Sequence, residues 1–268
     1  MRLIAIPPYQ NPAVNWGWVL HELLDDYRKT GALEGVEVDV DEGYLVESTP
    51  EARDEEFLAN ISVGIIKKVR EYSEMGKYDG IVLTGALDPG FVGARAVSKI
   101  PVTAAIHSSV HVASLIGERC SILMATAPGG LIVRHCVERY GLSHKVAGVR
   151  LAGHSTTEMY GFLSKYKDNK EERVKFPEVK KIIDDIMAQG IAAIEQDRAD
   201  TFILGCEPFL TFEDEIRRRL DEAGYDEIQV VSSLSAAVEM AKAMVNMKLV
   251  KAPRAYPSPA LKAKPEYW

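Results

Sequence analysis

The sequence predicts an α/β fold with two similar lobes, each built on a parallel sheet. A pseudo-twofold duplication relates the lobes and places the candidate site in the cleft between them. Two observations lead to this prediction. Apolar runs rich in Val and Ile alternate with amphipathic segments of helix length, a pattern typical of parallel strands covered by helices on both faces. In addition, the segment Asp-Gly-Ile-Val-Leu-Thr-Gly at residues 79–85 returns in outline as Asp-Thr-Phe-Ile-Leu-Gly-Cys at residues 200–206.

The apolar runs predict the strands, and the amphipathic segments between them predict the helices. Predicted strands lie at residues 3–6, 36–40, 80–84, 101–106, 121–125, 146–151, 201–205 and 227–231. Predicted helices include residues 52–72, 129–140, 176–196 and 212–223. Thr49 and Pro50 open the first of these helices, and Gly141 and Gly224 stand where a helix C-terminus favours glycine.

Two further pairs of segments repeat at nearly the same spacing and support a duplicated unit. They are residues 2–8 with 121–128, and residues 107–110 with 231–234. Because parallel strands end toward the same edge of such sheets, equivalent loops of the two units face each other across a cleft. The first repeat makes Gly85 and Cys206 the facing positions, and this asymmetry is the main functional clue.

The duplication also predicts how the chain divides. We expect a first lobe of residues 1–105 plus 226–250, because the last strand and helix of such folds often cross back. A second lobe comprises residues 106–225, and residues 251–268 form a C-terminal arm with four prolines. The arm is either loosely packed or laid on a neighbouring subunit, and we expect a homo-oligomer.

Composition and charge narrow the class of protein. The 268 residues carry a net charge of −7 that is spread along the chain, so a nucleic-acid partner is not expected. No apolar run is long enough to predict a membrane span, and the N-terminus shows no basic-then-apolar leader. Three cysteines without a Cys-x-x-Cys spacing argue against a disulfide framework and a zinc site, and favour the cytoplasm. The expected partner is a small-molecule substrate, with no metal.

Cys206 is the first candidate for chemistry. It follows a predicted buried strand and precedes the helix that begins near Phe212, whose positive end would lower the pKa of the thiol. The alternative is a small apolar residue that fills a strand end. Cys120 begins a strand and Cys136 lies on an amphipathic helix, so we interpret both as packing residues.

Several segments together resemble the aspartate/glutamate/hydantoin racemase superfamily, most of all its hydantoin racemase branch, over about residues 1–250. They are Leu-Gly-Cys at 204–206, Val-Leu-Thr-Gly-Ala-Leu-Asp-Pro-Gly at 82–90, and residues 116–122 and 139–142. In that family two cysteines, one per lobe, flank the substrate. One removes a proton from the carbon next to a carbonyl, and the other returns a proton to the opposite face without cofactor or metal. The resemblance implies that Cys206 is the downstream cysteine.

The upstream cysteine of the family falls at Gly85, and neither Thr84 nor Ala86 replaces a thiol. Because inversion by two bases needs an acid on each face, the departure implies single-face chemistry on a hydantoin-type or carboxylate compound. The reaction would be a proton transfer, a decarboxylation, an elimination or the removal of a ring substituent. Arylmalonate decarboxylase resembles the chain in this respect, with a glycine upstream, one cysteine downstream and a Pro-Pro pair matched by Pro7 and Pro8. A side chain placed at Gly85 is expected to point into the space left open by the glycine, with a risk of steric failure.

Two alternatives stay open. A true racemase would need a second base that is not a cysteine, and Glu207 and His154 are the candidates. A non-catalytic small-molecule binding protein is the other, since two-lobed α/β folds also clamp ligands without reacting with them.

The remaining candidate residues lie in loops after predicted strands. Glu207 either orients a water or faces solvent, and His154 either binds a substrate carboxylate, acts as a base or is a solvated loop residue. Amides and hydroxyls of residues 107–109 either hold an anion or cap a helix. The expected substrate-binding residues are Pro8, Tyr9, Gly85, Ala86, His107, Ser108, Ser109 and Thr126.

Overall fold

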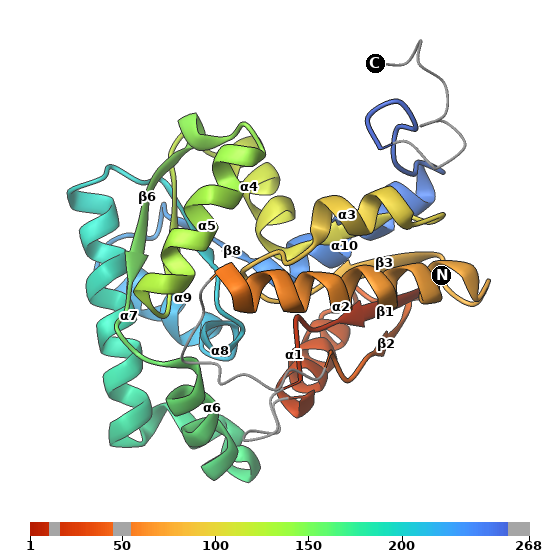
Figure 1. Cartoon of the computed structure of the whole chain (residues 1–268). Helices are drawn as coiled ribbons and strands as arrows, with labels where there is room; N and C mark the ends of the chain where they lie inside the picture. Colours follow the sequence, from red (N-terminus) through yellow and green to blue (C-terminus); the bar gives the residue numbers. More distant parts are fainter. Residues whose placement is uncertain (11–16, 45–54, 257–268) are drawn as a thin grey trace.

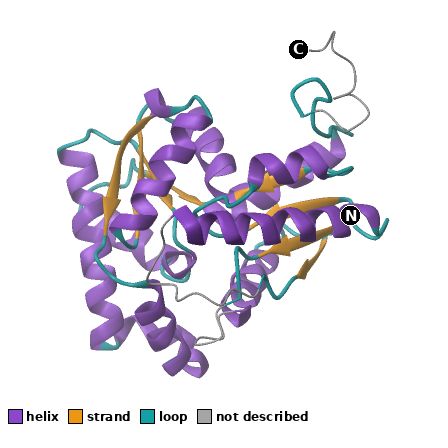
Figure 2. Ribbon diagram, in the orientation of Figure 1, coloured by secondary structure: helices purple, strands orange, loops and turns teal. Residues whose placement is uncertain are grey.

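The computed structural model describes residues 1–10, 17–44 and 55–256, and this part of the chain contains two four-stranded parallel sheets surrounded by helices (Figures 1 and 2). The first sheet has the order β2-β1-β3-β4. Its strands are β1 Arg2–Ile6, β2 Glu37–Val40, β3 Gly80–Leu83 and β4 Val102–Ala104. The second sheet repeats this order as β6-β5-β7-β8. Its strands are β5 Cys120–Met124, β6 Val146–Leu151, β7 Thr201–Leu204 and β8 Gln229–Ser232. The repeated order confirms the predicted α/β fold with two similar sheets.

The helices follow the strands in alternation, as predicted. They are α1 Gly17–Lys29, α2 Glu55–Glu74, α3 Phe91–Val97, α4 Ala105–Ile116, α5 Ala127–Arg139, α6 Thr156–Lys165, α7 Pro177–Glu195, α8 Glu207–Leu210, α9 Glu213–Glu222 and α10 Ser233–Asn246, with 3-10 helices η1 Ser143–Lys145 and η2 Lys167–Lys175. Gly141 and Gly224 follow α5 and α9 with φ of 72° and 84°, the left-handed conformation that suits glycine at a helix end. The predicted start of α2 at Thr49 and Pro50 lies outside the described residues. None of the helices in the described ranges is long and apolar enough to cross a membrane.

The two sheets share one hydrophobic core. A single cluster of buried side chains includes Leu3 and Val82 from the first sheet and Leu123 and Leu204 from the second. All four side chains are at most 2% exposed. Burial of this continuous apolar surface is the main force that holds the lobes together.

The last strand and the last helix join different lobes. Strand β8 pairs in parallel with β7 in the second sheet, with Val231 opposite Ile203. Helix α10 then packs on β3 and β4 of the first sheet, where the Thr103 hydroxyl donates a hydrogen bond of 2.9 Å to the Ala237 carbonyl. The sequence predicts that all of residues 226–250 belong to the first lobe. That assignment is wrong for the strand, because the chain crosses between lobes only after β8. The predicted arm is described only as far as Tyr256.

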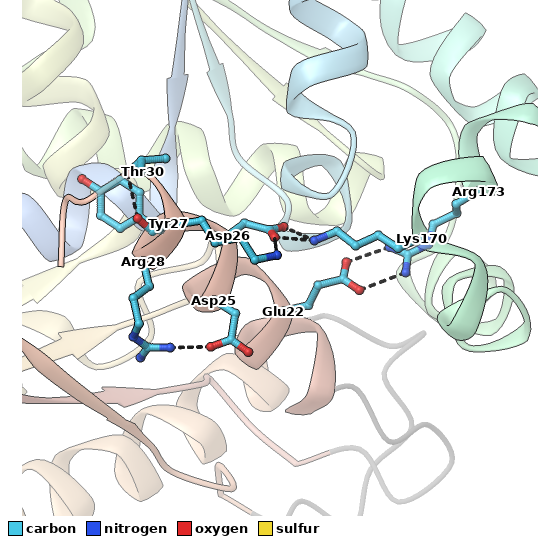
Figure 3. A network of polar contacts seen from close by, with 9 residues as sticks. Glu22, Asp25, Asp26, Tyr27, Arg28, Thr30, Lys170 and Arg173 are labelled. Carbon is cyan, nitrogen blue, oxygen red and sulfur yellow. Dashed lines mark hydrogen bonds and ion pairs between the residues drawn. The ribbon is translucent and has the colours of Figure 1, made fainter. Parts of the chain in front are cut away.

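Ion pairs connect α1 of the first lobe with η2 of the second, and Figure 3 shows their side chains facing each other. The Arg173 guanidinium donates to both carboxylate oxygens of Glu22, at 2.8 and 3.0 Å, and Arg173 is only 1% exposed. Beside it the Lys170 ammonium binds the Asp26 carboxylate. We call these two pairs the interlobe clasp.

Candidate active site

A small pocket lies where strands β3 and β7 end, one from each sheet. The pocket is lined by Pro8, Tyr9, Gly85, Ala86, Leu87, Met124, Thr156, Tyr160, Cys206, Glu207 and Pro208. Gly85 follows β3 and Cys206 follows β7, so the fold brings the two halves of the sequence repeat to one place. Of the expected substrate-binding residues, Pro8, Tyr9, Gly85 and Ala86 line this pocket.

Cys206 lies at the pocket because it follows directly on the end of β7. Gly205 donates its amide proton to the Leu123 carbonyl at 3.0 Å, and a Cβ at Gly205 would lie 2.5 Å from Met124 Sδ. A larger residue at Gly205 would require the Met124 side chain to move, and Cys206 comes next in the chain at the pocket wall. Cys206 is 5% exposed and is the N-cap residue of the short helix α8. The helix expected near Phe212 is α9, and α8 lies between it and the cysteine.

The other two thiols lie in different surroundings. Burial raises the pKa of Cys120 to about 11 and that of Cys136 to about 12. Cys136 Sγ donates a weak hydrogen bond to the Leu87 carbonyl, while Cys120 is part of strand β5. Neither lines the pocket that contains Cys206. Both thiols therefore have the packing environment that we predicted for them.

Gly85 faces the ring of Pro8 rather than open space. Its φ is 82°, and a Cβ there would lie 2.8 Å from Pro8 Cγ and 2.9 Å from Pro8 Cδ. Real Cβ atoms do not approach carbon so closely, and the positive φ is unfavourable for other residues. The space at this position is therefore not open, and a side chain there meets the steric conflict that we expect as a risk.

Glu207 forms a buried polar pair with Tyr160, a residue of α6. The Tyr160 hydroxyl donates to Glu207 Oε2 at 3.0 Å. Burial raises the pKa of Glu207, and the neighbouring Thr84 and Tyr160 hydroxyls oppose this shift only in part. Within the described ranges, Glu207 Oε1 and Thr84 Oγ1 are both buried without a hydrogen bond of good geometry. The pocket thus holds a carboxyl group that retains its proton to higher pH than an exposed glutamate.

His154 does not reach this pocket. Its Nε2 lies 2.8 Å from Asp185 Oδ2, and its Nδ1 lies 3.7 Å from Glu158 Oε2. The loop before α6 thus directs the ring to carboxylates on α7 and α6. The predicted role of His154 as a base at the site is not supported by this geometry.

The start of α4, which includes the segment at residues 107–109, binds a carboxylate of the protein itself. The backbone amides of Ile106 and His107, at the start of α4, donate to the Asp88 carboxylate at 3.0 and 2.8 Å, and the Tyr140 hydroxyl donates to it at 2.7 Å. The helix end that we expected to hold a substrate anion is therefore occupied by the protein's own carboxylate. The sequence offered one signal for this, because Asp88 and the following proline come three residues after Gly85.

The serines and Thr126 are likewise not part of the pocket lining. Ser108 and Ser109 are fully buried, and the Ser109 hydroxyl donates to the Ala105 carbonyl one turn earlier in α4. Thr126 is the N-cap residue of α5, and its side chain makes no capping hydrogen bond.

Five lining residues were missed in the sequence, although one pair carries a recognisable signal. Thr156 and Tyr160 are four residues apart on α6 and so project from one face of that helix. The missed residues are Leu87, Met124, Thr156, Tyr160 and Pro208. Within the described ranges, no group of three or more His, Cys, Asp or Glu side chains is arranged to hold a metal ion.

Comparisons with known proteins agree with this architecture. A hydantoin racemase from Pseudomonas sp. (strain NS671) is 28% identical over 184 residues, which cover 69% of this chain. The match spans 65% of that relative, just under two thirds of its length. Allantoin racemases from Klebsiella pneumoniae and Pseudomonas fluorescens share the fold, with TM-scores of 0.72 and 0.74 and identities of 21% and 19%. Each similarity covers 97% of this chain, and 94% and 97% of those chains.

The family assignment rests on the sequence. A family model described as Asp/Glu/Hydantoin racemase matches residues 21–241, which is most of the chain. This protein therefore belongs to the Asp/Glu/Hydantoin racemase family.

Proposed function

We propose that the protein is a cofactor-independent enzyme of the hydantoin racemase type that transfers a proton at one face of a carbon next to a carbonyl group. The substrate would be a small hydantoin-type or carboxylate compound. The observation that carries this proposal is the asymmetry of the pocket, in which Cys206 stands at the end of β7 and Gly85 at the end of β3. A thiol can deliver a proton to one face, and glycine offers no acid to the other.

The lining suggests a role for each group. Cys206 removes a proton from the substrate carbon, or returns one after a carboxylate has left as carbon dioxide. The backbone turn through Gly85 and Ala86 holds the oxyanion of the enolate that forms in between. The buried pair of Glu207 and Tyr160 binds a polar substituent and keeps it oriented toward Cys206.

Racemisation with Glu207 as the second acid is the other candidate function. It is favoured by one observation, the raised pKa of a carboxyl group that lines the pocket and so can carry a proton. Glu207 follows Cys206 directly in the chain, which would require the two acids to reach opposite faces from one strand end. This requirement makes single-face chemistry the preferred proposal.

The test follows the α-proton of the substrate. Enantiopure hydantoins and substituted malonates are incubated with the enzyme in deuterated water, and deuterium content and optical purity are measured. Single-face chemistry predicts deuterium incorporation or decarboxylation with retained optical purity. Rapid loss of optical purity would instead establish a second acid, with Glu207 the first residue to suspect.

Cys206→Ser tests the residue itself. Loss of a general acid is expected to lower turnover by roughly 10²- to 10⁴-fold, because a hydroxyl is far less acidic than a thiol. Cys120→Ala and Cys136→Ala are the matched controls and should keep their activity, since neither thiol lines the pocket. A Cys206→Ser enzyme with near wild-type turnover would refute the assignment.

A further inference from the structure

A second cavity, of about 420 Å³, lies between helices α3, α4 and α10 and the segment that leads to Tyr256. It shares no lining residue with the Cys206 pocket. A volume of this size accommodates a small organic molecule. His107, which the sequence predicts at the active site, lines this cavity instead.

Arg95 supplies a positive charge without a direct counter-ion. Its guanidinium carbon lies 4.2 Å from the centre of the Phe91 ring and 4.4 Å from that of Tyr256. In the described ranges no carboxylate lies within ion-pair distance of this guanidinium, and Arg95 Nε is buried without a hydrogen-bond partner. Asp88, the carboxylate whose charge acts on Arg95, already accepts three hydrogen bonds from other groups. Among the described residues these two rings are the close neighbours of the guanidinium, and no hydrogen bond uses its N–H groups, which suit a planar anion.

The other polar groups of the cavity are also donors. The Lys251 ammonium donates to the carbonyls of Ala96 and Ser98, which leaves one of its three protons for a ligand. Burial lowers the pKa of His107 to about 3 and also lowers that of His111, so both rings are neutral near pH 7. No aspartate or glutamate is among the described residues that line this cavity. The cavity therefore carries two positive charges and no negative one.

The rest of the lining is apolar, and this decides what kind of anion fits. Side chains of aliphatic residues and methionines face the cavity from β4, α4, α10 and the loops beside them. They are Ile100, Val102, Leu115, Met240, Met244 and Val250. A bare phosphate or sulfate ion would leave this surface in contact with water, whereas an apolar body attached to the anion would cover it.

We propose that this cavity is a binding site for a small monocarboxylate with an aromatic or branched aliphatic body, held through its carboxylate by Arg95. The site is separate from the Cys206 pocket and does not depend on the reaction proposed there. Its ligand would contribute the negative charge that the described residues around Arg95 lack.

Benzoate and phenylacetate are suitable probes, with inorganic phosphate and acetate as controls. Binding is measured by titration calorimetry on the full chain. We expect saturable binding of an aromatic carboxylate, weaker binding of acetate and phosphate, and a loss of affinity of about 10- to 100-fold in Arg95→Met, as for a lost charge-assisted hydrogen bond. Arg70→Met, at an exposed position on α2, is the matched control and should bind as the wild type does.

NMR signals of the methionine methyl groups show where in the protein the probe binds. In protein labelled with ¹³C at the methionine methyls, the probe should shift the signals of Met240 and Met244 and leave that of Met124, in the Cys206 pocket, in place. Met244→Trp, which fills the cavity and keeps Arg95, should also abolish binding and guards against an Arg95 variant that does not fold. Absence of saturable binding of both aromatic probes, unchanged affinity in Arg95→Met and Met244→Trp, or a shift of Met124 alone would overturn the proposal.

Discussion

The contact between Gly85 and Pro8 decides how the missing second cysteine can be tested. Substitution of Gly85 by cysteine places Cβ against the Pro8 ring at 2.8 Å, in a backbone conformation that costs a non-glycine residue about 1–3 kcal/mol. Pro8→Ala removes the two ring carbons that collide and leaves Pro8 Cβ at 3.7 Å, an ordinary contact. A useful variant therefore combines Gly85→Cys with Pro8→Ala.

We expect Gly85→Cys alone to be destabilised and the double variant Pro8→Ala/Gly85→Cys to recover part of the loss. If the second thiol completes a two-acid site, the double variant should also racemise a substrate whose optical purity the Pro8→Ala control preserves. Chiral chromatography and urea denaturation measure the two effects. A well-folded double variant without racemisation would contradict the view that the glycine prevents inversion.

Glu207 gives a prediction about pH at the same scale. Its pKa is raised in the folded protein, so its contribution to stability is present at acid pH and is lost as the pH rises through the folded-state pKa. Glutamine keeps an oxygen for the Tyr160 hydroxyl but does not titrate. The free energy of unfolding of Glu207→Gln relative to wild type should therefore increase from pH 4 to pH 8.

Urea denaturation at intervals of pH measures this difference. Glu227→Gln, which makes the same substitution at an exposed position, serves as the control. A difference for Glu207→Gln that falls with rising pH would mean that the buried carboxyl is stabilised as an anion. Such a result would remove the observation that favours it as a proton carrier.

At the scale of the element, the alternation of apolar and amphipathic segments was enough to predict the strands, because buried parallel strands leave a strong signal in the sequence. It predicted too long a strand at residues 101–106, where β4 ends at Ala104 and the Asp88 carboxylate caps the following helix. Helix α8 was missed because four residues are too few to show a helical period. The strand repeat was enough to predict that Gly85 and Cys206 lie at the same pocket. The orientations of the His154 and His107 rings could not be predicted, because they depend on carboxylates and aromatic rings from distant segments of the chain.

The interlobe clasp is the element-scale feature with the clearest energetic consequence. Arg173 and Glu22 have side-chain exposures of only 2% and 15%, so removal of one partner leaves a buried charge without compensation. Glu22→Gln or Arg173→Met should each destabilise the protein by about 3–5 kcal/mol. The double variant should lose less than the sum, which a double-mutant cycle by urea denaturation measures. Strictly additive losses would show that the pair contributes no coupling between α1 and η2.

At the scale of the whole molecule, the lobes are joined in three ways. They share a core that includes Leu3 and Leu204, the clasp connects α1 with η2, and α10 leaves the second sheet to cover the first. Neither sheet can therefore lose its partner without exposing apolar surface. The pocket between Gly85 and Cys206 depends on this arrangement, because each lobe supplies only one of its walls.

This arrangement predicts one cooperative unfolding transition, with equal calorimetric and van't Hoff enthalpies, rather than one transition per lobe. A chain that ends at Ser232 lacks α10 and leaves the β3 and β4 surface uncovered, so it should lose the cooperative transition and bind a hydrophobic dye. A chain that ends at Tyr256 keeps α10 and the shared core and should unfold as the full chain does. Two separate transitions in the intact protein, or a normal transition without α10, would mean that the lobes are independent folding units, because the shared helix would then add nothing to the stability of the first sheet.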